Sequence, residues 1–266
     1  MTKTAWVHIG SPKTGTKSIQ TFMSGNRSRL KKYNVLYPGK ELWHARLGSF
    51  CSDSDPRYIA NVHSGLVNQQ RILELDNNWI RAICSEVAES DANNLVFSYE
   101  GLFQPNEKRI RALKEFLSGI ASKIVIIAYV REPVSQVSSE FSTNALLGFP
   151  SGYKPRRRPV PNVLEMYRAV FGKASVIVRP FERDQLKGLD LTEDFMSYIG
   201  VSSEDFARLE PLNESKNKGL SKLAVKFLRM AKSELGDNIS TREFHETYGR
   251  IAHQIPGPKF RFEADD

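Results

Sequence analysis

Residues 7–20 read VHIGSPKTGTKSIQ, which is a short apolar run, a loop of small and hydroxyl-bearing residues, and the start of a helical pattern. A strand, loop and helix in this order make an anion site, because the first N–H groups of the helix point out of its end and the helix dipole favours negative charge there. Lys13 adds a positive charge inside the loop. We therefore expect a phosphate-like or sulfate-like group to bind at residues 13–18.

The loop differs from a Walker A loop by the position of its lysines. A Walker A loop has a glycine, four residues, a second glycine, and then lysine followed by serine or threonine. Gly10 and Gly15 have this separation, but Thr16 stands where the lysine is needed, and Lys17 comes one place late. One residue along a helix turns a side chain by roughly 100°, so Lys17 cannot replace the missing lysine.

Length and composition favour one large domain. The chain has 266 residues, of which 40% are hydrophobic, and this allows a sizeable core. We find no internal repeat and no change in composition that would mark a linker. The sequence predicts a single domain over residues 1–253, followed by a loose, charged C-terminal tail over residues 254–266.

The charge and the cysteines restrict the class of protein. The net charge of +8 fits an acidic ligand or an anionic polymer, and ordinary surface charge explains it equally well. Two cysteines are too few for a disulfide framework, so a reducing compartment is the default. The first residues read as a core strand, not a signal peptide, and no stretch approaches the roughly 18 apolar residues of a membrane span. We expect a cytoplasmic protein.

Hydrophobic patterns predict strands that alternate with helices. Strands are expected at about 5–9, 35–37, 95–99, 124–130 and 175–181, and helices at 16–31, 72–87, 110–117, after 133, and in several segments up to about 252. Residues 40–63 are mixed and loop-like. The nearly all-apolar run 124–130 suits a central parallel strand that is buried on both faces. The pattern predicts a three-layer α/β fold, with a mostly parallel sheet flanked by helices, of the P-loop nucleotide-binding type.

Polar groups follow three of the predicted strands. They are the loop Lys13–Ser18, the segment Ser98–Glu100, and Arg131. Parallel sheets bind ligands beyond the carboxyl ends of their strands. Each cluster alone is explained by helix capping or surface pairing, but together they indicate a site at one rim of the sheet.

Two motifs resemble those of sulfotransferases that use 3′-phosphoadenosine 5′-phosphosulfate (PAPS). Residues 12–16, PKTGT, resemble the loop that holds the 5′-phosphosulfate in this family. Residues 129–141 are similar to the 3′-phosphate motif, in which an arginine at a strand end is followed eight residues later by a serine on the next helix; Arg131 and Ser139 have this spacing. The resemblance covers mainly residues 5–31 and 95–145, with a weaker echo at residues 212–215.

The resemblance implies sulfuryl transfer from PAPS to a hydroxyl or amine, with no metal. Lys13 and the loop amides would stabilise the charge of the transferring group. The implied donor contacts are Lys13, Thr14, Gly15, Thr16, Lys17, Ser18, Arg131 and Ser139. Lys17 replaces a threonine that is common in the family, so the backbone amide is kept and a hydroxyl is lost; its side chain either touches the nucleotide phosphate or points to solvent. The histidines show no paired metal-ligand spacing.

The acceptor must lose a proton, and two residues are candidates for the base. Glu100 lies in a stretch that looks like the Ser-x-Glu segment of carbohydrate and bacterial members, and His44 lies in a segment where such enzymes often carry a histidine. We expect His44 to be the base, because histidine titrates near neutral pH, and Glu100 to hold the acceptor or the lysine. The alternatives are a loop histidine at position 44 and a capping or salt-bridged carboxylate at position 100.

Other readings stay open at this point. A P-loop kinase fits the strand, loop and helix, but the lysine is misplaced and no apolar strand ends in a magnesium-binding aspartate. An inactive homologue that binds polyanions fits the charge. Arg131 could pair with Glu132 or Glu140 instead of a phosphate, and the basic run 153–159 is either a lid or a solvated loop. No pattern indicates nucleic-acid binding. A glycan or a small molecule is the favoured acceptor.

Overall fold

The computed structural model describes residues 2–104, 106–149, 160–212, 219–236 and 238–262. The chain forms two compact units. The sheet unit comprises Met1–Val130 and Pro159–Asn213, and the helical unit comprises Arg131–Arg158 and Glu214–Asp266. The single domain expected over residues 1–253 stays a prediction. The basic run 153–159 and most of the segment 212–215 lie outside the described residues.

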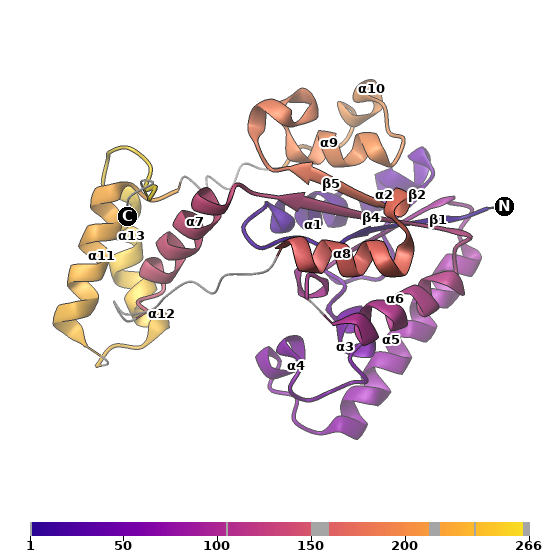
Figure 1. The fold of residues 1–266 in the computed structure, drawn as a ribbon, viewed down its shortest axis with the longest axis horizontal. Helices are drawn as coiled ribbons and strands as arrows, with labels where there is room; N and C mark the ends of the chain where they lie inside the picture. Colours follow the sequence, from indigo (N-terminus) through magenta and orange to yellow (C-terminus); the bar gives the residue numbers. More distant parts are fainter. Residues whose placement is uncertain (1, 105, 150–159, 213–218, 237, 263–266) are drawn as a thin grey trace. The chain divides into compact units, whose positions relative to one another are not determined.

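The sheet unit is built on five parallel strands (Figure 1). The strands are β1 (Thr4–His8), β2 (Val35–Leu36), β3 (Asn94–Ser98), β4 (Lys123–Val130) and β5 (Val176–Pro180). They lie in the order β2-β3-β1-β4-β5, so β1 is central, and His8 is paired in register with Ser98. Every strand lies within one residue of its predicted bounds. The predicted α/β fold with a parallel, P-loop-like sheet is confirmed.

Helices cover both faces of this sheet, which gives three layers (Figure 1). One core packs Ala5 and Val7 of β1, and Ile9 just after it, against α5 (Gln69–Glu89), α6 (Glu107–Ser118) and α8 (Val160–Phe171). The other packs the opposite face of the strands against α1 (Thr16–Gly25) and α9 (Leu191–Tyr198). Alternate side chains of a strand point to opposite faces, so an apolar strand such as β4 serves both cores.

Two predictions for the shorter elements need correction. The helix expected over residues 16–31 divides into α1 and α2 (Arg27–Leu30), because Asn26 turns its side chain to the carbonyl of Glu210 at 3.0 Å and accepts from the Glu210 N–H at 2.8 Å. The stretch expected to be loop-like, residues 40–63, contains α3 (Ala45–Phe50) and α4 (Ile59–His63). A short helix, α10 (Ser203–Phe206), follows α9.

Buried Asp76 explains why α3 and α4 form. This carboxylate on α5 accepts hydrogen bonds from Arg46, from Ser49 at 2.6 Å and from Ser54 at 2.9 Å, and Asn61 donates to Ser49. A buried carboxylate needs several donors. The donors come from the segment that had no clear hydrophobic pattern, so its order could not be read from periodicity.

The helical unit is a small bundle with its own core. It contains α7 (Pro133–Leu146), α11 (Lys222–Leu235), α12 (Thr241–Phe244), a π-helical turn (His245–Gly249) and α13 (Arg250–Gln254). The buried side chains that fill this core are Ala145, Leu220, Ala224, Val225, Leu228, Phe244 and Ala252. Pro133 occupies the first turn of α7, as predicted.

The segment after α13 packs on the helical unit as far as Phe262, where composition predicted a loose tail over residues 254–266. The ring of Phe260 stacks on Phe141 of α7 with centroids 5.4 Å apart, and its N–H donates to the Leu220 carbonyl. The N–H of Phe262 donates to Ser138 Oγ at 2.9 Å. Two aromatic residues among prolines and charges therefore anchor this segment, where composition alone suggested disorder.

Candidate anion-binding loop and its surroundings

The loop between β1 and α1 has the backbone of an anion cradle. Gly10, Lys13 and Gly15 all have positive φ, of 47°, 64° and 75°. Helix α1 begins at Thr16 with no side-chain cap, and the N–H groups of Ser18 and Ile19 both donate to the Gly15 carbonyl. The N–H groups of the first helical turn otherwise lack partners within a helix, and they attract anions.

Glycine is required at both ends of this loop. A Cβ at Gly10 would lie 2.6 Å from Thr16 Oγ1, and a Cβ at Gly15 would overlap Leu191 and lie 3.2 Å from the ring of Phe181. The two glycines thus let the loop close on itself and let residues from the segments after β5 approach it. Phe181 and Leu191 border the loop, although the sequence pattern did not single them out.

The hydroxyl groups of the loop divide into two kinds. Thr14, expected to contact the donor, is buried and donates its hydroxyl to the Ser11 carbonyl at 2.5 Å, so its side chain holds the loop together. The hydroxyls of Ser11 and Thr16 are also buried, and neither has a hydrogen-bond partner. Unpartnered buried hydroxyls are unusual, and donors of this type fit the oxygens of a phosphate or sulfate group. The loop residues therefore fit the expected ligand.

The three other predicted loop residues lie at different depths. Lys13 is half-buried at the centre of the loop. Lys17 is exposed on the second residue of α1, and Ser18 is half-buried on the third. The side chain of Lys17 is exposed to solvent, which is one of its two expected positions. Lys13 is the lysine that lies within the loop.

Ser98 at the end of β3 joins four segments of the sheet unit. Its hydroxyl bonds to His8 Nδ1 at 2.9 Å, and its carbonyl accepts from Gln20 of α1 at 3.3 Å and from the His44 N–H at 3.1 Å. Its own N–H donates to His44 Nδ1 at 2.9 Å. These buried bonds connect β3, which precedes Glu100, to β1 and α1, which lie on either side of the loop.

The expectation that His44 is the base is corrected by these bonds. Because the Ser98 N–H can only donate, His44 Nδ1 is an acceptor; Nε2 then carries the proton and donates to the Pro38 carbonyl at 2.9 Å. Burial lowers the pKa of His44 to about 4, against the opposing effect of its two backbone bonds. Both ring nitrogens are occupied in a fully buried ring, so His44 is a structural residue here.

Glu100 occupies a position that suits a base. It is exposed and opens a short 3₁₀ turn, Glu100–Leu102, two residues after Ser98. Because His8 and Ser98 are paired in parallel strands, the loop and Glu100 leave the same edge of the sheet. Burial, and after it the neighbouring Tyr99, raises the pKa of Tyr58.

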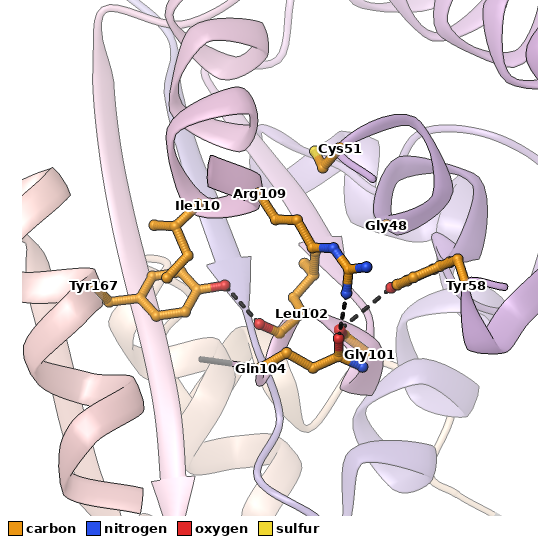
Figure 2. A pocket seen from close by; sticks show the side chains of 9 residues that line it. All are labelled: Gly48, Cys51, Tyr58, Gly101, Leu102, Gln104, Arg109, Ile110 and Tyr167. Atoms are coloured by element: carbon orange, nitrogen blue, oxygen red, sulfur yellow. Dashed lines mark hydrogen bonds between the residues drawn. The ribbon is translucent and has the colours of Figure 1, made fainter. Parts of the chain in front are cut away.

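Gly101, the residue after Glu100 in the chain, lines a hollow (Figure 2). It is small, with room for little more than one water molecule. Figure 2 shows the Arg109 guanidinium and the Tyr58 hydroxyl converging on it; Arg109 donates to Gln104 at 2.6 Å, and Tyr58 donates to the Gly101 carbonyl at 3.3 Å. A Cβ at Gly48 or at Gly101 would overlap the side chains of Tyr58 and Tyr99. Polar donors therefore line this hollow.

The second predicted motif begins the helical unit. Arg131 follows the last residue of β4, and its Nε donates to Ser135 Oγ at 2.9 Å. Glu132 caps α7 by accepting from the N–H groups of Val134 and Ser135, both at 2.8 Å, and it pairs with Arg261 at 3.2 Å. Ser139 is half-buried in the second turn of α7. Burial, ahead of the nearby Arg261 charge, lowers the pKa of Arg131.

Sequence reasoning missed Ser11, His8 and Tyr58. His8 ends β1 and Ser11 lies in the loop that follows, and both are fully buried. A polar residue at the end of an apolar strand was the signal that could have marked them. Among the described residues, no group of three or more His, Cys, Asp or Glu side chains could hold a metal ion, and no helix is long and apolar enough to cross a membrane.

No protein-family model matches the chain, and no curated protein matches it.

Proposed function

We propose that the protein is a sulfotransferase that moves a sulfuryl group from PAPS to a hydroxyl or amine of an acceptor. The observation that carries the proposal is the loop after β1, which combines Lys13, an uncapped helix N-terminus and two buried hydroxyls without partners. The lysine lies inside the loop, as in the resembling family, and not at the Walker A position. The pair Arg131 and Ser139 supports a nucleotide that carries a 3′-phosphate.

Each part of the site has a role in this proposal. When bound, PAPS supplies an activated sulfuryl group: sulfur gains a bond to the acceptor oxygen or nitrogen and loses its bond to the bridging oxygen, which leaves on 3′,5′-bisphosphoadenosine. Lys13 and the N–H groups that begin α1 stabilise the negative charge that builds up on the bridging oxygen. The resemblance assigns Arg131 and Ser139 to the 3′-phosphate of the donor.

Glu100 is the residue we propose as the base. The acceptor releases a proton as its new bond to sulfur forms, and the Glu100 carboxylate takes it. Glu100 lies at the protein surface, whereas both ring nitrogens of the buried His44 are hydrogen-bonded to the backbone. We propose that the acceptor is a glycan or a small hydroxylated molecule.

Ligand-induced thermal stabilisation tests the donor. We expect 3′,5′-bisphosphoadenosine to raise the melting temperature without magnesium, because a ligand at 100 times its Kd adds about 2.7 kcal/mol to the stability of the native state. The Lys13→Ala variant should lose most of this shift. The matched Lys17→Ala variant removes an exposed lysine from the same loop and should keep it.

Three results would count against the proposal. A larger shift with ATP and magnesium would indicate a kinase. A shift with heparin alone, and none with the adenosine nucleotide, would indicate a protein that binds polyanions through its positive surface. Equal losses in the Lys13 and Lys17 variants would show that the loop lysine acts only through general charge.

A further inference from the structure

Buried polar atoms without partners are concentrated around one loop. Among the described residues the side-chain atoms of this kind are His8 Nε2, Ser11 Oγ, Thr16 Oγ1, Asn93 Oδ1 and Arg168 Nε. Three of the five belong to residues 8–16. An unpartnered buried polar atom destabilises a protein, since it has given up its bonds to water without replacing them. Such atoms persist where a ligand or a function requires them.

Ser11 is the member of this group with no assigned role. Its side chain is fully buried, and its carbonyl, not its hydroxyl, takes part in the loop by accepting from Thr14. His8 differs, because its other ring nitrogen is bonded to Ser98 and its ring packs against Tyr129 and Phe195. Thr16 faces Gly10 across the loop.

We propose that the Ser11 hydroxyl, together with that of Thr16, binds an oxygen of the donor's 5′-phosphosulfate. This rests on the proposed function and adds a residue that neither motif assigned. Residues 10–18 contain no carboxylate, and they include two lysines. A hydroxyl in such surroundings donates its proton to an anionic oxygen, and a charged acceptor makes this a strong hydrogen bond.

The loop must shift for the Ser11 hydroxyl to reach the anion, because without ligand it is closed to water. Lys13 lies two residues away in a left-handed conformation, with φ of 64°, that lysine rarely adopts. In this proposal, a rotation of the backbone near Lys13 relieves this conformation and opens Ser11 to the ligand. Anion binding and loop movement are therefore coupled in this proposal.

The test compares stability and affinity in the same variants. Ser11→Ala removes a hydroxyl that has no partner, so the ligand-free protein should melt at the same temperature or higher, while its affinity for 3′,5′-bisphosphoadenosine should fall about tenfold or more by calorimetry. Thr14→Val is the matched control: it removes a hydroxyl that is bonded within the loop, and it should lower the melting temperature. Ser11→Cys, close in size with a weaker donor, should reproduce the loss of affinity.

A second nucleotide locates the lost contact. Adenosine 3′-monophosphate lacks the 5′ group, so the Ser11 variants should bind it as the wild type does. The inference fails if Ser11→Ala lowers the melting temperature as Thr14→Val does, or if it leaves the affinity for the bisphosphate unchanged. If wild-type protein binds inorganic pyrophosphate but no adenosine nucleotide, the proposed function fails; a loss of pyrophosphate affinity in Ser11→Ala would then still support Ser11 as an anion ligand.

Discussion

Two buried histidines show how position decides the role of a residue. His8 and His44 both contact Ser98, and both are fully buried. Burial lowers the pKa of His8 to about 3 and that of His44 to about 4, so both are neutral in the folded protein near neutral pH. A histidine in a loop-like sequence can be a base or part of a core, and only its hydrogen-bond partners distinguish the two.

Acid should therefore destabilise the fold. In the unfolded chain these histidines have a pKa near 6.5. As the pH falls below 6.5, the unfolded state therefore binds protons that the folded state does not bind. Stability is fully present above pH 6.5 and is lost towards pH 4, by up to about 1.4 kcal/mol per pH unit for each histidine. Urea unfolding at a series of pH values measures this slope.

The His44→Phe variant is the control for that slope. The variant leaves the Ser98 N–H and the Pro38 carbonyl without partners, so its free energy of unfolding at pH 7.5 should fall by about 2–5 kcal/mol. Because it also removes one titrating group, its stability should depend less steeply on pH. Its affinity for 3′,5′-bisphosphoadenosine should not change. An unchanged stability in this variant would return His44 to the candidates for the base.

At the scale of elements, α9 is fixed to the sheet by one carboxylate. Asp194 of α9 is buried and accepts from the Tyr129 hydroxyl at 2.7 Å, from Arg179 at 2.9 Å and from the Lys187 N–H at 3.0 Å. Tyr129 belongs to β4 and Arg179 to β5. The same helix carries Leu191, which borders the anion loop at Gly15, so the bonds to Asp194 set one wall of the site.

Loss of this carboxylate should be costly. Asp194→Ala leaves the half-buried Arg179 and the Tyr129 hydroxyl without their shared partner. We therefore expect a loss of about 3–5 kcal/mol in the free energy of unfolding. Glu210→Ala breaks the exposed pair with Arg29 and should cost less than about 1 kcal/mol. Denaturant titrations of both variants compare them. Similar small losses would mean that α9 is held by its apolar contacts alone.

The elements were easier to predict than the site. Strands β1, β3 and β4 are strongly apolar, so their period and ends could be read from the sequence. The loop after β1 was predicted from glycine, lysine and a helix start, which are local features. The role of His44 depends on which groups lie opposite it, and its partner Ser98 is 54 residues away. Periodicity holds no information at that range.

For the whole molecule, the division into two units was not visible in composition. The helical unit takes α7 from the middle of the chain and the other helices from its end. Its core is small, and the segment after α13 contributes the Phe260 ring that stacks on α7. Because that segment is charged and contains prolines, its composition predicted a loose tail and not a packed aromatic ring.

Removal of the terminal segment tests its contribution. A chain that ends at residue 254 loses Phe260 and Phe262, and α7 should then exchange its amide hydrogens at least about tenfold faster, because its packing is weakened. The sheet unit should keep its protection. A chain that ends at residue 262 retains both rings and serves as the control; equal exchange of α7 in the two chains would mean that the segment adds no stability.

The discontinuous helical unit has a consequence for synthesis. A ribosome completes the strands β1 to β4 and then α7, but the partners of α7, from α11 onward, follow only after residue 221. During that interval the apolar face of α7, including Phe141 and Ala145, has no core to join. The nascent chain therefore passes through a stage in which this face is open to chaperones or to other chains, and slower elongation between α7 and α11 would prolong that exposure.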